Sequence, residues 1–400
     1  MKRRRVKITG IGFVTPAGIG RTQFWYAIQS SASYARVLKS LPEEAGVFVG
    51  MEVPNFQPEP TLTTAAIKRL PRHTQFALTA AKLALSDAKL SFSSLRNCSP
   101  LVVVGASLMD FGSINKGIDL ILRKGPTSAL PSTVFTASVS SIGGAIGEAI
   151  GGTTRTLTLQ SACCAGSDAI GQAADMVANG EAEVALCGGT EAPLYLHPLL
   201  ELRMAGLAPS NPDNPERQCR PFDLWRTTGA IGEGACMLIL EPESSPRQGY
   251  AFIEGYSFSS DATEMPGSGL SQALQLALAN ARRKPADVDC INAWGPGHRI
   301  IDAAESLALI ETFGSDLRRI PTVSIKGAIG NPLGAAGAIQ VGCAALSLSK
   351  GIIPPTVNWQ YPDPECPLNL SSKTRTVRHE LTVVNSHGLS GTNACLVLAR

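Results

Sequence analysis

Two adjacent cysteines, Cys163 and Cys164, stand where an apolar run turns into a helix rich in small residues, in the stretch TLTLQSACCAGSDAIGQAADMVANG (156–180). A thiol at the N-terminus of a buried helix lies beside unpaired backbone N–H groups and the positive end of the helix dipole. Both lower its pKa and make thiolate available. Thiolates in such positions attack acyl carbonyls, including those of thioesters. The stretch therefore predicts a nucleophilic cysteine.

The other cysteines do not form a second chemical site. They are scattered through apolar patterns, and the ten cysteines of the chain include no CxxC pair. This spacing excludes the usual zinc motifs, so we expect no metal, and it does not suggest a secreted disulfide framework. A reducing cytoplasm is the expected location.

Composition and charge exclude several classes of protein. The chain has 400 residues, 44% hydrophobic and 17% charged, with 39 glycines and a net charge of +3, as in a globular α/β enzyme. MKRRRVK (1–7) is the one basic run, and nothing aromatic or basic continues it, so we expect no nucleic-acid partner. Gly and Pro interrupt the residues after it, which excludes a signal peptide. No membrane span is expected, because no apolar run reaches about 18 residues.

The elements that must position the cysteine alternate along the chain. Strand-like runs and helix-like stretches follow one another, which predicts an α/β fold with a mostly parallel sheet. In the first part we expect strands at 5–11, 99–105, 156–160, 182–187 and 235–240, with helices at 74–88 and 167–179. In the second part we expect strands at 250–258, 289–293, 322–325 and 379–385, with helices at 269–281, 301–313 and 334–349.

The two parts contain an internal echo. TLTLQSACCAGSDAIGQAADMVANGEAEVALCGG and PTVSIKGAIGNPLGAAGAIQVGCAALSLSKGIIP both run from a strand through a turn into a helix of small residues. Small residues allow such a helix to be buried on nearly all sides. The echo predicts a duplicated fold, with two helix N-termini facing each other across a pseudo-twofold axis.

These stretches resemble β-ketoacyl-acyl-carrier-protein synthases, on the elongating ketosynthase branch of the thiolase superfamily. The resemblance covers essentially the whole chain. It rests on SACCAGSDAIG, KITGIGFVTPAGIG, RPFDLWRTTGAIGEGACMLILE, INAWGPGHRIIDAAESLALIETFG, SIKGAIGNPLGAAGAIQ and NSHGLSGTNACLVL. It implies a five-layered αβαβα fold made of two related halves, 1–249 and 250–400.

The resemblance also implies the substrates and the partners. Acyl groups would arrive on the phosphopantetheine of an acyl carrier protein or of CoA, with no permanently bound cofactor. The chain would be a homodimer or a heterodimer with a ketosynthase, paired through the strand at 157–160.

Several site residues follow from the resemblance, position by position. Cys163 matches the acyl acceptor, and Cys164 occupies a small-residue position. The backbone N–H groups of Cys163 and Leu389 match the oxyanion hole. Lys326 and Glu305 match a charged pair that orients the loops.

The chain departs from the family where malonyl thioesters are decarboxylated. Two histidines are expected there, and this chain has Trp294 at the first position and Asn331 at the second. Indole and carboxamide groups donate hydrogen bonds but cannot take or return a proton near neutral pH. Asn331 alone also resembles the chain-initiating synthases, so Trp294 is the more serious departure.

Other departures surround the same expected cavity. Pro296 and His298 replace the two threonines that bind the pantetheine arm. His387 and Leu389 replace aromatic gate residues, and Gly229 replaces another aromatic. His387 could supply a relocated base, with His298 as a second candidate. Leu108 and Met109 fall where the family lines its acyl pocket, which suggests an altered pocket.

Three functions remain open at this point. The chain could be an accessory subunit beside an active ketosynthase, as chain-length factors are in type II polyketide systems, although such factors usually lack the cysteine. It could be an independent Cys-dependent acyltransferase or non-decarboxylating synthase. Third, it could be a 3-oxoacyl-carrier-protein synthase of the fatty-acid type that uses His387.

Overall fold

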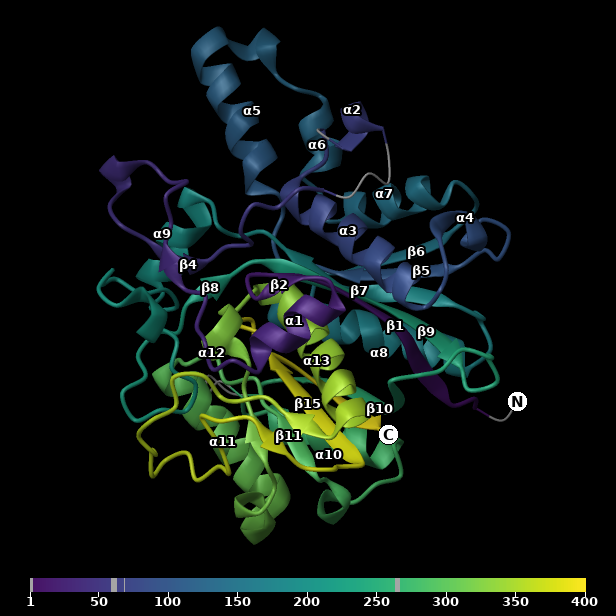
Figure 1. Ribbon diagram of the computed structural model, residues 1–400. Coiled ribbons are helices and arrows are strands. Elements are labelled where there is room, and N and C mark those ends of the chain that lie inside the picture. The colour runs from purple at the N-terminus through teal and green to yellow at the C-terminus, as the bar shows by residue number, and fades with distance from the viewer. Residues whose placement is uncertain (1–2, 59–62, 68, 263–266) are drawn as a thin grey trace.

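The apolar runs form one long twisted sheet in the computed structural model, which describes residues 3–58, 63–67, 69–262 and 267–400 (Figure 1). Strands β7, β5 and β6 are parallel, and β9 joins them to β1 by antiparallel pairing. The strands of this first half are β1 (Val6–Thr15), β5 (Leu101–Gly105), β6 (Arg155–Leu159), β7 (Ala185–Glu191) and β9 (Gly234–Pro242).

The second half repeats the arrangement. Strands β12, β11 and β15 are parallel, and β16 joins them to β10 by antiparallel pairing. These strands are β10 (Ala251–Ser260), β11 (Cys290–Asn292), β12 (Thr322–Val323), β15 (Leu381–His387) and β16 (Thr392–Ala399). The two half-sheets meet at β1 and β10, which pair only over Val6–Ile8.

Helices cover both half-sheets and fill the space between them, which gives the expected αβαβα layers. Helices α3 (Arg72–Asp87) and α7 (Ser140–Ile150) cover the outer face of the first half. Helices α10 (Leu270–Asn280) and α11 (Arg299–Phe313) belong to the outer layer of the second half. Helices α8 (Ala165–Ala178) and α13 (Ala336–Lys350) pack against each other in the central layer (Figure 1).

The N-termini of the two central helices touch, as the internal echo predicts. A Cβ atom added at Gly166 would lie 2.7 Å from the Gly334 carbonyl oxygen and 3.0 Å from the Ala338 nitrogen. Only glycine permits this approach of two backbones, because any side chain would force them apart. The turn before each helix is therefore held at the centre of the molecule.

The expected strands and helices all form, with ends displaced by a few residues. The expectation of a mostly parallel sheet is wrong, because β1, β9, β10 and β16 pair antiparallel and make the sheet mixed. Sequence reasoning missed β16 and several helices, among them α5 (Phe111–Lys124), which projects from the body in Figure 1. The remaining elements are short: β2 (Gly18–Ile19), α1 (Arg21–Ile28), β3 (Arg36–Val37), β4 (Val49–Met51), α2 (Thr64–Ile67), α4 (Phe92–Leu95), α6 (Ser132–Thr136), α9 (Leu196–Met204), β8 (Ile231–Gly232), α12 (Lys326–Ile329), β13 (Ile352–Ile353) and β14 (Arg375–Thr376).

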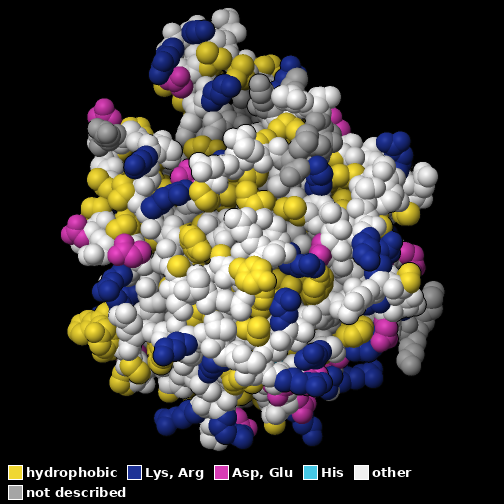
Figure 2. Space-filling model, in the orientation of Figure 1, with side chains coloured by type: hydrophobic (Ala, Val, Ile, Leu, Met, Phe, Trp, Pro, Cys, Tyr) yellow, Lys and Arg dark blue, Asp and Glu magenta, His cyan; other side chains and the backbone are white. Residues whose placement is uncertain are grey.

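The basic N-terminal run makes ion pairs within the chain. Arg3 pairs with Asp175, Arg4 with Glu183 and Arg5 with Glu243, while Met1 and Lys2 lie outside the described residues. On the face shown in Figure 2, basic side chains are scattered, with acidic ones among them at the lower edge. None of the helices in the described part of the chain is long and apolar enough to cross a membrane.

Strand β6 ends the sheet, and its residues are largely exposed, with Leu157 at 40%. An exposed edge strand is a template for pairing with a second chain. We predict a dimer at micromolar concentration that Leu157→Asp weakens at least about tenfold, because like charges would meet at a two-fold axis. Sedimentation velocity measures this, with Tyr26→Asp on α1 as the matched exposed control. A wild-type monomer would contradict the prediction.

Candidate active site

The thiol of Cys163 lies in a short 3₁₀ turn, Ala162–Cys164, between β6 and α8. Ala162 precedes it with φ 48°, a left-handed conformation that side chains rarely adopt. The second half repeats the feature, because Leu333 with φ 42° opens the turn Leu333–Ala335 before α13. The duplicated turn brings Cys163 to the junction of the two halves.

Burial dominates the chemistry of this thiol. Cys163 is 3% exposed, and burial, together with the charge of Glu191, raises the pKa of its thiol to about 12. Hydrogen bonds from the Leu389 N–H and the Asn331 side chain, and the charge of Lys326, oppose this shift without cancelling it. The expectation of a lowered pKa is therefore wrong, because the helix N-terminus is buried and desolvation penalises the thiolate.

The two adjacent cysteines have different surroundings. Cys163 lines a cavity, whereas Cys164 is fully buried in the main hydrophobic core. The Cys164 sulfur lies 3.3 Å from the Thr392 carbonyl oxygen, to which its thiol donates. Only Cys163 is thus placed to meet a substrate.

The cavity brings together residues from both halves of the chain. Seven of the residues singled out from the sequence line it: Cys163, Trp294, Pro296, His298, Asn331, His387 and Leu389. Sequence reasoning missed the rest of the wall, which is mostly apolar: Leu202, Leu207, Thr228, Ala230, Ile231, Ile301 and Leu333. Most of these residues carry no chemical signal, so only the tertiary packing reveals them.

Trp294 is held from two sides by the expected charged residues. Glu305 accepts the Trp294 and Gly295 N–H groups, both at 2.8 Å, and Lys326 Nζ donates to the Trp294 carbonyl oxygen at 2.7 Å. Lys326 Nζ also lies 3.7 Å from the indole centroid, a cation–π contact. No ion pair within 4.0 Å joins Glu305 and Lys326 among the described residues. They act together through the Trp294 backbone.

Both of these charged groups are fully buried. Burial lowers the pKa of Lys326 to about 7 and raises the pKa of the Glu305 carboxyl. Each charge partly offsets the shift of the other. Neither residue lines the cavity, so their role is to fix the loop that carries Trp294.

Asn331 is fixed by its own backbone. Its N–H donates to the Ala230 carbonyl at 2.8 Å, and its carbonyl accepts from the Gly232 N–H at 3.0 Å. The side chain donates toward the Cys163 thiol, and its buried Oδ1 has no hydrogen-bond partner among the described residues. One acceptor is therefore left free beside the thiol.

His298 begins helix α11, and its Nδ1 accepts the Ile301 N–H at 3.4 Å. Burial and the positive charge of Arg226 lower the pKa of His298. The neutral ring therefore carries its proton on Nε2 and can donate but not accept there. This tautomer suits a hydrogen-bond donor to a pantetheine arm better than a base.

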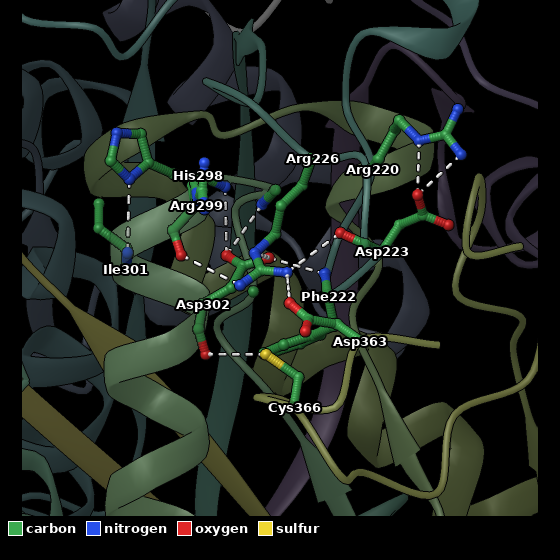
Figure 3. Close-up of polar contacts among 12 residues, drawn as sticks. Arg220, Phe222, Asp223, Arg226, His298, Arg299, Ile301, Asp302, Asp363 and Cys366 are labelled. Atoms are coloured by element: carbon green, nitrogen blue, oxygen red, sulfur yellow. Dashed lines mark hydrogen bonds and ion pairs between the residues drawn. The ribbon is translucent and has the colours of Figure 1, made fainter. Parts of the chain in front are cut away.

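A buried polar cluster that sequence reasoning missed supports this loop (Figure 3). Asp302 accepts the N–H groups of Phe222, Gly297 and His298 at 2.7, 3.1 and 3.2 Å. Arg226 pairs with Asp363 and lies 3.8 Å from Asp302. The signal lay in two of the quoted motifs, in which Arg226 follows the apolar Leu224 and Trp225 and Asp302 lies between Ile301 and Ala303.

Three other expected residues lie around the cavity rather than on it. Leu108 packs against the apolar cluster that contains Cys163 and Trp294, and its N–H donates to Glu191 at 3.3 Å. Gly229 has φ 73°, and its Cα lies so close to the Pro296 carbonyl that no Cβ would fit. Met109 is 51% exposed, so it does not line the cavity as expected. Its side chain lies at the surface, directly before helix α5.

His387 ends strand β15, is 5% exposed and lines the cavity. Its Nδ1 lies 2.8 Å from Asn393 Oδ1 on the paired strand β16. Its neighbour Gly388 approaches the Cys163 nitrogen. The structure thus brings His387 and Cys163 to one cavity.

A duplicated αβαβα fold with a buried cysteine at the junction of its halves is the arrangement of thiolase-like proteins. Models of the beta-ketoacyl synthase N-terminal and C-terminal domains match residues 3–245 and 250–360. The chain therefore belongs to the beta-ketoacyl synthase family.

Relatives and solved structures cover nearly the full chain. The 3-oxoacyl-[acyl-carrier-protein] synthase 2 of Coxiella burnetii is 30% identical over 100% of this chain and 99% of its own length. The ishigamide ketosynthase/chain length factor superposes with a TM-score of 0.92 at 28% identity, covering 99% of each chain. The ketosynthase AntDE, solved with its type II polyketide carrier protein AntF, superposes at 0.90 with 27% identity and 99% coverage of each chain.

Proposed function

We propose that this chain accepts an acyl group from a phosphopantetheine thioester onto Cys163, is a poor decarboxylating condensing enzyme by itself, and acts beside a partner ketosynthase. The substrate would arrive on an acyl carrier protein, with no permanently bound cofactor. The structural similarity to a ketosynthase/chain length factor and to a ketosynthase–carrier protein complex supports both partners.

One observation carries this proposal. The cavity keeps a cysteine with two hydrogen-bond donors, while a locked indole lies at the position of the first family histidine. Thioester exchange needs a nucleophile and donors for the oxyanion, and both are present. Decarboxylation also needs stabilisation of the malonyl enolate as CO₂ leaves. Trp294 and Asn331 offer neutral donors only, and the larger ring of Trp294 takes up space there.

A second function, an independent acyltransferase or non-decarboxylating synthase, is favoured by a specific observation. His387 shares the cavity with Cys163 and is hydrogen-bonded at Nδ1 to Asn393, a contact that orients the ring. An accessory subunit that only shapes a tunnel has no need of such a pair. Co-purification separates the two functions: a second ketosynthase indicates the subunit, and a homodimer indicates the independent enzyme.

The proposed impairment is tested by the release of labelled CO₂ from malonyl-carrier protein. We expect the chain alone to be at least about 10²–10³ slower than an ordinary ketosynthase, the loss typical of removing one oxyanion donor. The same protein should still form an acyl adduct at Cys163 with an acyl-carrier protein. Turnover equal to that of an ordinary ketosynthase would refute the impairment.

A further inference from the structure

A buried thiol whose pKa is raised to about 12 is protonated at neutral pH. As it attacks a thioester, its proton must move to a base within reach. Of the residues that line the cavity, two are histidines, His298 and His387. Their hydrogen bonds decide which of them can accept the proton.

A chain of hydrogen bonds assigns the proton on His387. Asn393 Nδ2 lies 2.7 Å from Asp261 Oδ1 and 3.3 Å from the Gly391 carbonyl oxygen, and both of these oxygens are acceptors. The amide nitrogen of Asn393 must therefore face them, so Oδ1 faces His387. An amide oxygen only accepts, so His387 Nδ1 must donate across the 2.8 Å contact.

The remaining nitrogen of this ring is then free to act. In the neutral ring Nε2 is unprotonated, and the hydrogen bond that the ring makes to the described residues is the one at Nδ1. His298 has the opposite tautomer, because its Nδ1 is the acceptor for the Ile301 N–H. Two histidines in one cavity thus present one acceptor and one donor.

Asp261 is itself held in place. Its Oδ1 also accepts the Gly269 N–H at 2.8 Å, and its own N–H donates to the Gly391 carbonyl at 2.7 Å. Asn393 is 1% exposed and lies on the strand that pairs with the His387 strand. The orientation of the imidazole is therefore set by hydrogen bonds that join strand β16 to the end of β10.

Resting on the proposed acylation of Cys163, we infer that His387 Nε2 is the base that accepts the Cys163 proton, and that Asn393 and Asp261 are positioning residues that hold its tautomer. The S–H bond breaks and an Nε2–H bond forms. The thiolate then attacks the thioester carbonyl carbon, and the carbonyl electron pair moves to oxygen. When this intermediate collapses, the bond from carbon to the pantetheine sulfur breaks, and that sulfur takes the proton from Nε2.

Other ionisable groups surround this pair. His298 lines the same cavity, and Glu191 and Lys326 act on the thiol through their charges. Asp261 lies behind Asn393, and Glu305 binds Asn385 at 3.1 Å on the His387 strand. A test must therefore attribute the pH dependence to His387 by substitution.

The test measures alkylation of Cys163 by iodoacetamide and its acylation by acetyl-N-acetylcysteamine, both against pH, in wild type and in His387→Gln. The wild-type rate should rise and then level off. In the variant we expect a fall of about 10²–10⁴-fold at neutral pH, with a tenfold rise per pH unit, because hydroxide is then the base. In Asn393→Ala we expect the same rates to fall by a smaller factor. His197→Gln is the matched control and should retain the levelling, because it removes an exposed histidine that does not line the cavity.

Two further measurements keep the inference testable if His387→Gln does not fold. His387→Phe keeps an aromatic ring and should show the same loss. In wild type, long-range nitrogen–proton NMR of labelled histidine reads the tautomer directly, and a proton on Nε2 of neutral His387 would overturn the inference. Equal pH profiles in wild type and His387 variants would overturn it too. If alkylation depends on His387 but Cys163 is not acylated, the proposed function is contradicted and the role of His387 as a base is not.

Discussion

Replacing Cys163 with alanine should abolish the acyl adduct, whereas replacing Cys164 with alanine should leave it. Cys163 lines the cavity with Leu389 and Asn331 as donors to its thiol. Cys164 is fully buried in the core, and its thiol donates to Thr392. Only the first sulfur can reach a thioester, so the expected effect is a loss to the background level.

Intact mass spectrometry after incubation with acyl-carrier protein or acyl-CoA measures this result as one added acyl group. Cys164→Ala is the matched control, because it removes the neighbouring thiol from the same turn. Thermal unfolding of both variants separates loss of the nucleophile from loss of the fold. An adduct that persists in Cys163→Ala and disappears in Cys164→Ala would reverse the assignment.

Replacing Glu305 with alanine should unfold the protein or bring it close to unfolding. The carboxylate accepts the N–H groups of Trp294 and Gly295 and the side-chain amide of Asn385, all of them buried. Each donor left without a partner costs about 1–3 kcal/mol. Three such donors cost about 3–9 kcal/mol, which is comparable with the whole stability of a typical domain.

Urea unfolding of Glu305→Ala and Glu305→Gln tests this prediction. Glutamine keeps one acceptor oxygen of the same reach, so Glu305→Gln leaves one N–H group without an acceptor. Its free energy of unfolding should fall by about 1–3 kcal/mol. The ratio of the two losses in free energy of unfolding matters more than either value. It distinguishes the effect of lost hydrogen bonds from the effect of a smaller side chain. Wild-type stability in Glu305→Ala would show that Lys326 alone holds the Trp294 loop.

The sequence by itself determined the layered fold and the position of the thiol that we propose as the nucleophile. Strand and helix patterns are local, so the elements around Cys163 could be placed within a few residues of their ends. The matching turn and helix after Leu333 could be predicted from the repeated sequence pattern, because a helix buried on all sides needs Gly and Ala in both halves. Trp294 and Asn331 could be recognised as replacements of the two family histidines, because the residues around them still align with the family motifs.

Only the tertiary structure decided the chemistry of these groups. The raised pKa of Cys163 comes from desolvation, and desolvation depends on packing from both halves rather than on the helix alone. The tautomer of His387 depends on Asp261, which lies far away in the sequence and reaches it through Asn393. Met109 follows directly after a residue that packs beside the cavity, yet its own side chain is exposed. The type of a residue determines which protons and hydrogen bonds its side chain can offer. Burial and partners that are distant in the sequence determine which of these it uses.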